Sequence, residues 1–101
     1  MSLRPATRAD LDRVRGVQPA WWGGRDLTAL LQSLFLENFA STSLILDDDD
    51  DGSLAGFLIG FPSQDDPAAA YVHFVGVAPN HRGAGVGRAL HDAFAQRMAE
   101  R

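Results

Sequence analysis

The apolar and polar positions of this chain repeat in two periods, one typical of strands and one typical of helices. Residues 71–77 are almost all apolar, β-branched or aromatic, which predicts a buried strand. We expect this strand to stop near Ala78, because Pro79 has no N–H for a ladder hydrogen bond. From Val86 the apolar residues recur at helical spacing, which predicts an amphipathic helix.

The beginning of the chain predicts a short strand and a short helix. Residues 2–5 form the expected strand, with Leu3 facing the core. Thr7 and Asp10 have the spacing of a capping box, in which each side chain satisfies a backbone N–H at a helix start. The apolar face of the helix that follows consists of Leu11, Val14 and Val17. We expect this helix to end at Pro19.

The widest apolar stripe in the chain begins after Asp26, which is a suitable N-cap. Its members are Leu27, Leu30, Leu31, Leu34, Phe35 and Phe39. This spacing predicts one long helix over residues 27–39, packed on a sheet through a purely structural face. Ser41, Thr42 and Ser43 end it.

Residues 44–46 and 53–61 predict two strands joined by an acidic turn. Five consecutive aspartates, residues 47–51, precede Gly52. Such a run can hold a divalent metal or steer a substrate, or it can be a solvated turn with Asp-Gly at its tip. The run lacks the alternating ligands of a calcium loop, which favours the turn and no metal.

The whole chain therefore has the element order β–α–α–β–β–β–α. Residues 62–67 are expected to form a polar loop and residues 68–77 the last strand. The predicted fold is of the α/β class, more closely α+β, with a mostly antiparallel sheet flanked by helices.

Length and charge narrow the classes of function. The 101 residues suit one domain, spanning 1–101. A net charge of −4 argues against a nucleic-acid partner, since such binding normally rests on a basic face. The absence of cysteine excludes disulfides and a thiol nucleophile. No apolar run approaches the length of a membrane span, so we expect a cytoplasmic protein with no membrane partner.

A glycine-rich loop lies between the strand of residues 71–77 and the helix that begins at Val86. Gly83, Gly85 and Gly87 occupy every second position. The first N–H groups of a helix have no partner inside it, and glycines let an anion approach them. The pattern therefore predicts a cradle for a phosphate or pyrophosphate, with Arg82 and Arg88 as counter-charges. The alternative is a tight turn that merely requires glycine.

Two common phosphate loops do not fit this stretch. A P-loop requires Gly-Lys followed by a hydroxyl residue, but Arg88 and Ala89 follow Gly87. The dinucleotide fingerprint requires G-x-G-x-x-G, and counting from Gly83 or from Gly85 places its third glycine at Arg88 or Leu90.

The remaining pattern is R-x-x-G-x-G over residues 82–87, preceded by V-x-P at Val77 and Pro79. It resembles the acetyl-CoA-binding signature of the GNAT superfamily of N-acetyltransferases. The match is close over residues 71–98, and upstream the order of elements agrees with the GNAT fold.

The resemblance implies acetyl-CoA as co-substrate and direct attack of an amine on its thioester. It implies that the backbone of Val75 and Val77 pairs with the pantetheine arm and that the N–H of Val77 stabilises the oxyanion. It implies that the pyrophosphate is held by the backbone of Arg82, Gly83, Ala84, Gly85, Val86 and Gly87, with Arg88 adjacent.

The attacking amine needs a proton acceptor, which the family commonly places on the strand before V-x-P. Strand alternation predicts that Tyr71, His73, Val75 and Val77 share one face. His73 is the candidate base, because an imidazole can accept a proton near neutral pH. Its alternative role is a histidine satisfied within the sheet.

Trp21 and Trp22 are the candidate acceptor-site residues. They fall in the expected loop of residues 19–24, where aromatic rings can line a pocket or hold a cation. The alternative is that one or both cap the core beneath the loop. The negative charge and the tryptophan pair lean toward a cationic amine.

GNAT domains usually continue with a fifth strand, a fourth helix and further strands, whereas this sequence stops at Arg101. It is thus expected to be C-terminally short: a fragment, a chain that pairs with a second copy, or a reduced domain. The open edge of the strand at 71–77 favours a homodimer or larger oligomer. Two functions remain: an N-acetyltransferase for a small-molecule or peptide amine, and a non-catalytic CoA-binding or oligomerisation module.

Overall fold

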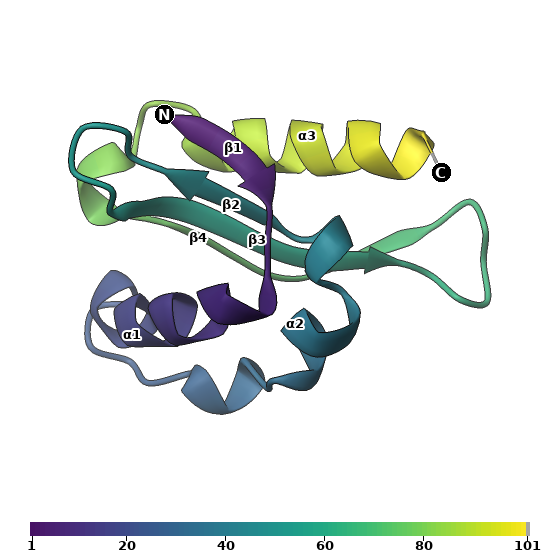
Figure 1. Ribbon diagram of the computed structural model, residues 1–101, viewed down its shortest axis with the longest axis horizontal. Coiled ribbons are helices and arrows are strands. Elements are labelled where there is room, and N and C mark those ends of the chain that lie inside the picture. The colour runs from purple at the N-terminus through teal and green to yellow at the C-terminus, as the bar shows by residue number, and fades with distance from the viewer. Residues whose placement is uncertain (101) are drawn as a thin grey trace.

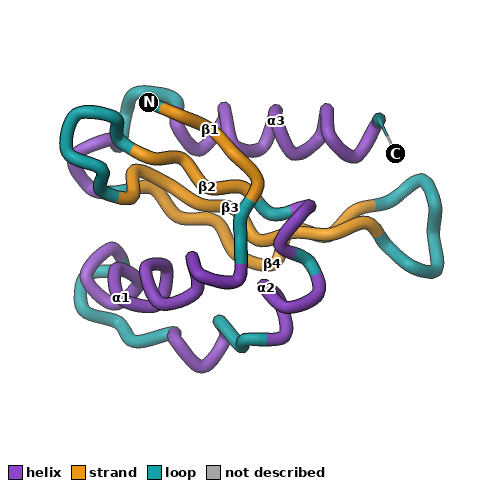
Figure 2. The backbone as a smooth tube through the Cα atoms, in the orientation of Figure 1, coloured by secondary structure: helices purple, strands orange, loops and turns teal. Residues whose placement is uncertain are grey.

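A computed structural model describes residues 1–100 as an antiparallel sheet between two helical layers (Figure 1). The strands are β1 (Ser2–Pro5), β2 (Leu44–Asp47), β3 (Leu54–Pro62) and β4 (Ala70–Val77), in the order β1-β2-β3-β4. The helices are α1 (Leu11–Trp21), α2 (Leu34–Asn38) and α3 (Val86–Ala99). Short 3-10 turns and loops connect them (Figure 2). The predicted α+β class and element order are confirmed.

Each face of the sheet has its own apolar cluster. Helix α3 covers one face through Val86, Leu90 and Phe94, which pack on Leu58 of β3. Helices α1 and α2 cover the other face, where Phe57 is fully buried. Burial of a side chain of this size contributes about 1.5–3 kcal/mol. The two layers hold the loop between β4 and α3 at one end of the sheet.

Glycine lets α3 approach the sheet closely. A Cβ built on Gly60 of β3 would lie 2.7 Å from the ring of Phe94, closer than real side-chain contacts allow. A larger residue at this position would push α3 away from the sheet.

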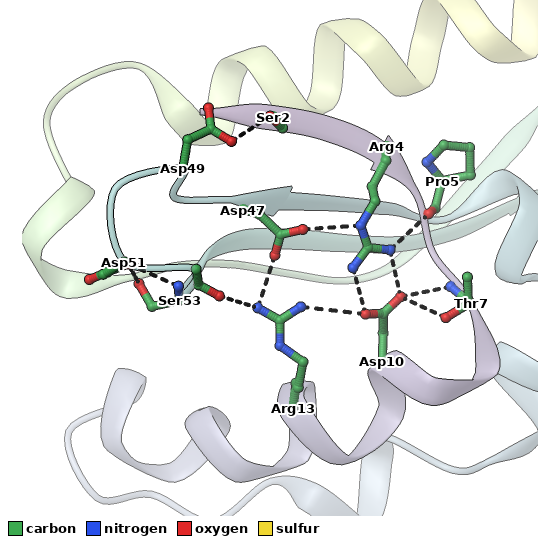
Figure 3. Close-up of polar contacts among 11 residues, drawn as sticks. Ser2, Arg4, Pro5, Thr7, Asp10, Arg13, Asp47, Asp49, Asp51 and Ser53 are labelled. Carbon is green, nitrogen blue, oxygen red and sulfur yellow. Dashed lines mark hydrogen bonds and ion pairs between the residues drawn. The ribbon is translucent and has the colours of Figure 1, made fainter.

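The predicted capping box at Thr7 and Asp10 is confirmed: it caps the 3-10 turn Arg8–Asp10 that leads into α1, and it belongs to a larger ionic cluster (Figure 3). The N–H of Thr7 donates to Asp10 at 2.8 Å. The Arg4 guanidinium donates to both Asp10 oxygens at 2.8 Å and to Asp47 at 3.0 Å. Arg13 donates to the other Asp47 oxygen at 2.9 Å. The cluster ties β1, β2 and α1 together.

Asp10 makes the stability of the fold sensitive to acid. The hydrogen bonds from Arg4 lower the pKa of Asp10 to about 2. Because the pKa is depressed in the folded state, its stabilisation is present above about pH 4 and is lost as the pH falls toward 2. We expect Asp10→Asn to lower the free energy of unfolding at pH 7 by about 2 kcal/mol.

Urea unfolding of Asp10→Asn and the wild type at pH 7 and near pH 2 measures this effect. The difference between them should shrink in acid. Asp12→Asn, an exposed change two residues further on in α1, is the control. A difference that does not vary with pH would contradict the assignment to the Asp10 carboxylate.

Helix α1 continues past Pro19 to Trp21, so the prediction that it ends at Pro19 is wrong. The proline removes only one backbone hydrogen bond. The last turn is held by Trp21, which is 8% exposed and stacks on Phe57 at 5.8 Å between ring centroids. Burial of this large ring outweighs the missing bond.

The predicted long helix over residues 27–39 is also wrong. The segment contains a 3-10 turn (Thr28–Leu30) and the short α2. Leu30 and Leu34 of the expected stripe are 49% and 41% exposed, whereas Leu36, outside it, is buried.

Side chains of α1 explain the break, because they take backbone groups that a continuous helix needs. Gln18 accepts from the N–H of Leu27 at 2.7 Å, and Arg15 donates to the carbonyl of Leu31 at 2.8 Å. Asp26 accepts the N–H of Thr28 at 3.0 Å and so caps only a turn.

Two smaller expectations also need correction. Leu3 is 46% exposed, because β1 is an edge strand that pairs only with β2. Strand β4 begins at Ala70 instead of residue 68, because the N–H groups of Ala68 and Ala69 both bond to Asp66 in a turn. Within residues 1–100, no helix combines the length and apolarity needed to cross a bilayer.

Candidate functional site

The loop from β4 into α3 has the backbone that its glycines predict. Gly83 has φ +82° and Gly85, the N-cap of α3, has φ +79°. A Cβ built on either glycine would meet no atom within 4 Å. The backbone conformation, and not crowding, is therefore what requires glycine at these two positions.

The N–H groups of this loop point to no acceptor within the described part of the chain. The first helical bond of α3 runs from the N–H of Ala89 to the carbonyl of Gly85 at 2.9 Å. None of the N–H groups of residues 83–88 donates a hydrogen bond to a backbone or side-chain oxygen of residues 1–100. Consecutive free N–H groups at a helix N-terminus form a concave binding site for an anion.

The open edge of β4 lies next to this loop. The N–H of Ala78 donates to Ala55 of β3 at 2.8 Å. Backbone groups alternate in direction along an antiparallel pair, so Val75 and Val77 direct theirs away from β3. The carbonyl of Val77 accepts from Nε of Arg82 at 3.2 Å, which agrees with this direction. At this edge, the N–H and C=O of Val75 and the N–H of Val77 can therefore pair with a ligand.

The side chain of Arg82 is hydrogen-bonded to the protein and does not project into the anion site; we call this pair of hydrogen bonds the Arg82 brace. Its Nη2 donates to the carbonyl of Trp21 at the end of α1, while its Nε holds Val77. The side chain predicted as a phosphate counter-charge therefore already bonds two carbonyl oxygens of the protein. Arg88 has a largely exposed side chain, 3.8 Å from Asp92.

Arg82→Met should destabilise the protein. It removes both hydrogen bonds of a charged donor, which together contribute about 1–3 kcal/mol. Thermal or urea unfolding measures the loss. Arg88→Met is the matched control, because the exposed Arg88 side chain should change stability by less than about 0.5 kcal/mol. Equal stability of the two variants would show that the brace is not formed in solution.

A bulge in β4 overturns one prediction about the site. Phe74 pairs with Ile59, but Val72 pairs with Gly60, so His73 has no partner in the register. The extra residue breaks the alternation of faces. Residues 71, 73, 75 and 77 therefore do not share one face.

The bulge divides these residues between the two layers. His73 stacks on Phe35 of α2 at 4.0 Å, and Tyr71 lies beside it at 6.2 Å. Val75 and Val77 instead pack against the α3 layer. The candidate base therefore lies on the α2 side of the sheet, whereas the side chains of Val75 and Val77 lie on the α3 side and the N–H of Val77 points to the open edge.

His73 is held by one of its two ring nitrogens. Its Nε2 lies 2.7 Å from the carbonyl of Leu30, which can only accept, so Nε2 is the donor and, in the neutral ring, Nδ1 has the lone pair. Val77 is four residues further on, a distance of about 13 Å along a strand. His73 is therefore too far from Val77 for a direct contact with a group held there.

The two tryptophans lie against the core, as their alternative interpretation predicted. Trp21 is buried, whereas Trp22 is partly buried and packs on Phe74 at 5.0 Å. The inner face of Gly76 is so close to Trp22 that a Cβ there would lie 2.8 Å from its ring.

The acidic residues form a turn, as the pattern favoured, with Gly52 at φ +72°. Within residues 1–100, no group of His, Asp or Glu side chains is arranged to hold a metal ion. A cavity of about 630 Å³ lies between the β3–β4 hairpin and the end of α3, lined partly by Pro62, Phe94 and Met98. It does not include the glycine-rich loop, which is an open surface site.

The sheet between two helical layers, the bulged β4 and the loop of free N–H groups together form the fold that comparisons with known proteins recognise. The family model described as the acetyltransferase (GNAT) family matches residues 11–101. The chain therefore belongs to the GNAT family, whose members transfer an acetyl group from acetyl-CoA. The search of curated proteins finds no match.

Solved structures have the same fold. Diaminobutyrate acetyltransferase from Paenibacillus lautus, in complex with L-2,4-diaminobutyric acid and coenzyme A, is 26% identical with a TM-score of 0.76, over 92% of this chain and 55% of that one. Ribosomal-protein-alanine N-acetyltransferase from Brucella melitensis is 22% identical with a TM-score of 0.70. The match covers 100% of this chain and 73% of that one. Phosphinothricin acetyltransferase from Sinorhizobium meliloti, in complex with AcCoA, is 17% identical with a TM-score of 0.69. The match covers 96% of this chain and 58% of that one.

The chain thus spans little more than half the length of the first of these structures. Sequence reasoning found the loop and the strand before it. It missed the Arg82 brace and the β4 bulge, because neither the carbonyl partners of an arginine nor a shift in strand register has a signal in a single sequence.

Proposed function

We propose that the chain is an N-acetyltransferase that transfers the acetyl group of acetyl-CoA to an amine by direct attack on the thioester. The observation that carries the proposal is the run of free N–H groups at residues 83–88 beside the open edge of β4. Family membership supports it.

The residues present suit the chemistry of acetyl-CoA. Its pyrophosphate is an anion, and the N–H groups of residues 83–88 are free donors at the positive end of α3. Its pantetheine arm carries amides, which need backbone partners such as those of Val75 and Val77. When bound, acetyl-CoA supplies an acetyl group activated as a thioester.

Val77 is proposed to stabilise the charge that develops on the reacting carbonyl oxygen. Its N–H is directed to the open edge, and its carbonyl is fixed by Arg82. A donor that is already oriented stabilises developing charge without a cost of reorganisation.

His73 is proposed as the acceptor of the amine proton, at Nδ1. The bond from Nε2 to Leu30 and the stacking on Phe35 orient the ring. Because of its distance from Val77 along β4, the proton passes through water.

The acceptor is proposed to be a small-molecule or peptide amine, preferably cationic in view of the net charge of −4. Trp22, which is only partly buried, is our candidate for a wall of the acceptor site, with the buried Trp21 beside it.

We also propose that two copies associate through the part of the β4 edge that precedes Val75, which leaves Val75 and Val77 for the pantetheine arm. Within the described residues this edge has no neighbouring strand, and unpaired edges invite pairing. Sedimentation of a monomer at micromolar concentration would contradict this.

An acceptor screen tests the function. The chain is incubated with acetyl-CoA and amines that include L-2,4-diaminobutyrate and peptides that begin with alanine, and release of the CoA thiol is followed. We expect release that depends on both the acceptor and the chain. Binding of acetyl-CoA without release would favour the second candidate, a non-catalytic CoA-binding module, for which the open β4 edge also provides an association surface.

A further inference from the structure

Most carboxylates of the acidic turn hold the protein's own groups (Figure 3). Asp47 belongs to the ionic cluster with Arg4 and Arg13. Asp49 pairs with the N-terminal ammonium at 2.8 Å, and Asp51 accepts from Ser53 at 2.6 Å. These contacts hold the turn against β1, α1 and the N-terminus. Asp48 makes a different contact.

Asp48 reaches across to the segment that enters the glycine-rich loop. Its Oδ2 accepts from Nε2 of His81 at 3.1 Å, and its Oδ1 accepts from the N–H of Asp50 at 2.9 Å. The side chains of Asp48 and His81 are only 15% and 17% exposed. Both carboxylate oxygens are thus used, and the pair is largely shielded from water.

His81 is well placed to control the loop. It ends the 3-10 turn Pro79–His81 and immediately precedes Arg82. Its N–H donates to Ala78 at 2.9 Å, next to the end of β4. In Figure 1 the β2–β3 turn and this segment lie at the same end of the sheet.

We propose that the Asp48–His81 pair is a latch that positions the phosphate-binding loop, with both side chains acting as positioning residues. Asp48 does not contact the cofactor in this account. The part of this proposal that concerns the affinity for acetyl-CoA rests on the proposed function.

The loop needs such a latch because its own hydrogen bonds do not fix it. The N–H groups of residues 83–88 are free, and two of its glycines have left-handed backbones. Its shape must be imposed from its ends, by α3 on one side and by His81 and Arg82 on the other. Donors held in place before binding lose less entropy when an anion arrives.

A purely electrostatic role for Asp48 predicts the opposite effect. A carboxylate near an anion site repels the anion, so its removal should strengthen binding. Asp50 supplies the matched control: it carries the same charge in the same turn, is exposed, and forms no side-chain hydrogen bond or ion pair within residues 1–100.

Calorimetric titration with acetyl-CoA compares the variants. We expect Asp48→Ala and His81→Ala each to weaken binding about tenfold, and the double variant to be no weaker than either, as for one shared interaction. His81→Gln keeps an N–H donor and should retain most of the affinity. Asp50→Ala should bind as well as the wild type or better. Asp48→Ala binding as tightly as Asp50→Ala would overturn the latch.

A second measurement does not depend on acetyl-CoA. Nitrogen-15 relaxation of the ligand-free protein reports the order of the backbone at residues 83–88. We expect lower order parameters there in Asp48→Ala and His81→Ala, and unchanged ones in Asp50→Ala and His81→Gln. If the wild type does not bind acetyl-CoA, the proposed function fails and relaxation alone decides the latch. Unchanged order in Asp48→Ala and His81→Ala would overturn it.

Discussion

Gly85→Val is expected to weaken acetyl-CoA binding by at least about a hundredfold, the loss of two hydrogen bonds to a charged group. Gly85 is the N-cap of α3 and has φ +79°, a conformation that a β-branched residue rarely adopts. To accept valine the backbone must rotate, which turns the N–H groups of residues 83–88 away from their common target. Calorimetric titration measures the change in affinity.

Gly24→Val separates this effect from general strain. Gly24 has φ +93° and open space around it, but it lies after α1 and outside the loop. Both variants should lose a similar amount of stability, about 1–2 kcal/mol or more. Only Gly85→Val should lose binding. If a folded Gly85→Val protein binds acetyl-CoA with wild-type affinity, the loop of residues 83–88 does not hold the cofactor.

His73→Gln is expected to lower turnover about 10²–10⁴-fold, the usual contribution of a general base. Glutamine can keep a donor for the carbonyl of Leu30, but it cannot accept the amine proton. The affinity for acetyl-CoA should stay within about twofold, because His73 lies on the α2 side of the sheet, away from the loop.

His91→Gln, an exposed change on α3, is the control for His73→Gln. Steady-state rates and binding constants for both proteins separate proton transfer from binding. If His73→Gln turns over as fast as the wild type, His73 is a histidine that only supports the sheet, and the proton acceptor must be sought elsewhere.

The parts of the fold with local signals were predicted well. The strand before the loop, the start of α3 at Val86 and the capping box at Thr7 each depend on neighbouring residues, and the structure confirms all three. The backbone of the loop also followed from its glycines, since the positive φ of Gly83 and Gly85 and the helix start after them are both local properties.

The errors arose where distant residues decide the local structure. The stripe over residues 27–39 has helical spacing, yet Gln18 and Arg15 of α1 bond the backbone of that segment and divide it. No periodicity within the segment reveals those partners. Tertiary contacts here override local propensity.

The site was predicted only in part, because distant residues decide its local structure as well. The β4 bulge at His73 depends on how β4 pairs with β3, and a shift of one residue moves side chains to the other face. Strand alternation alone therefore grouped His73 with Val75 and Val77 incorrectly. The Asp48–His81 pair joins residues 33 positions apart, and the aspartate run by itself indicated only a turn.

Calorimetric titration of the purified chain with acetyl-CoA, and separately with CoA, tests the central claim most directly. We predict saturable binding of both ligands with dissociation constants of about 1–100 μM, within the usual range for enzyme substrates. Saturable binding would show that the free N–H groups of residues 83–88 and the open β4 edge form a working cofactor site. A folded chain that binds neither ligand would contradict the claim.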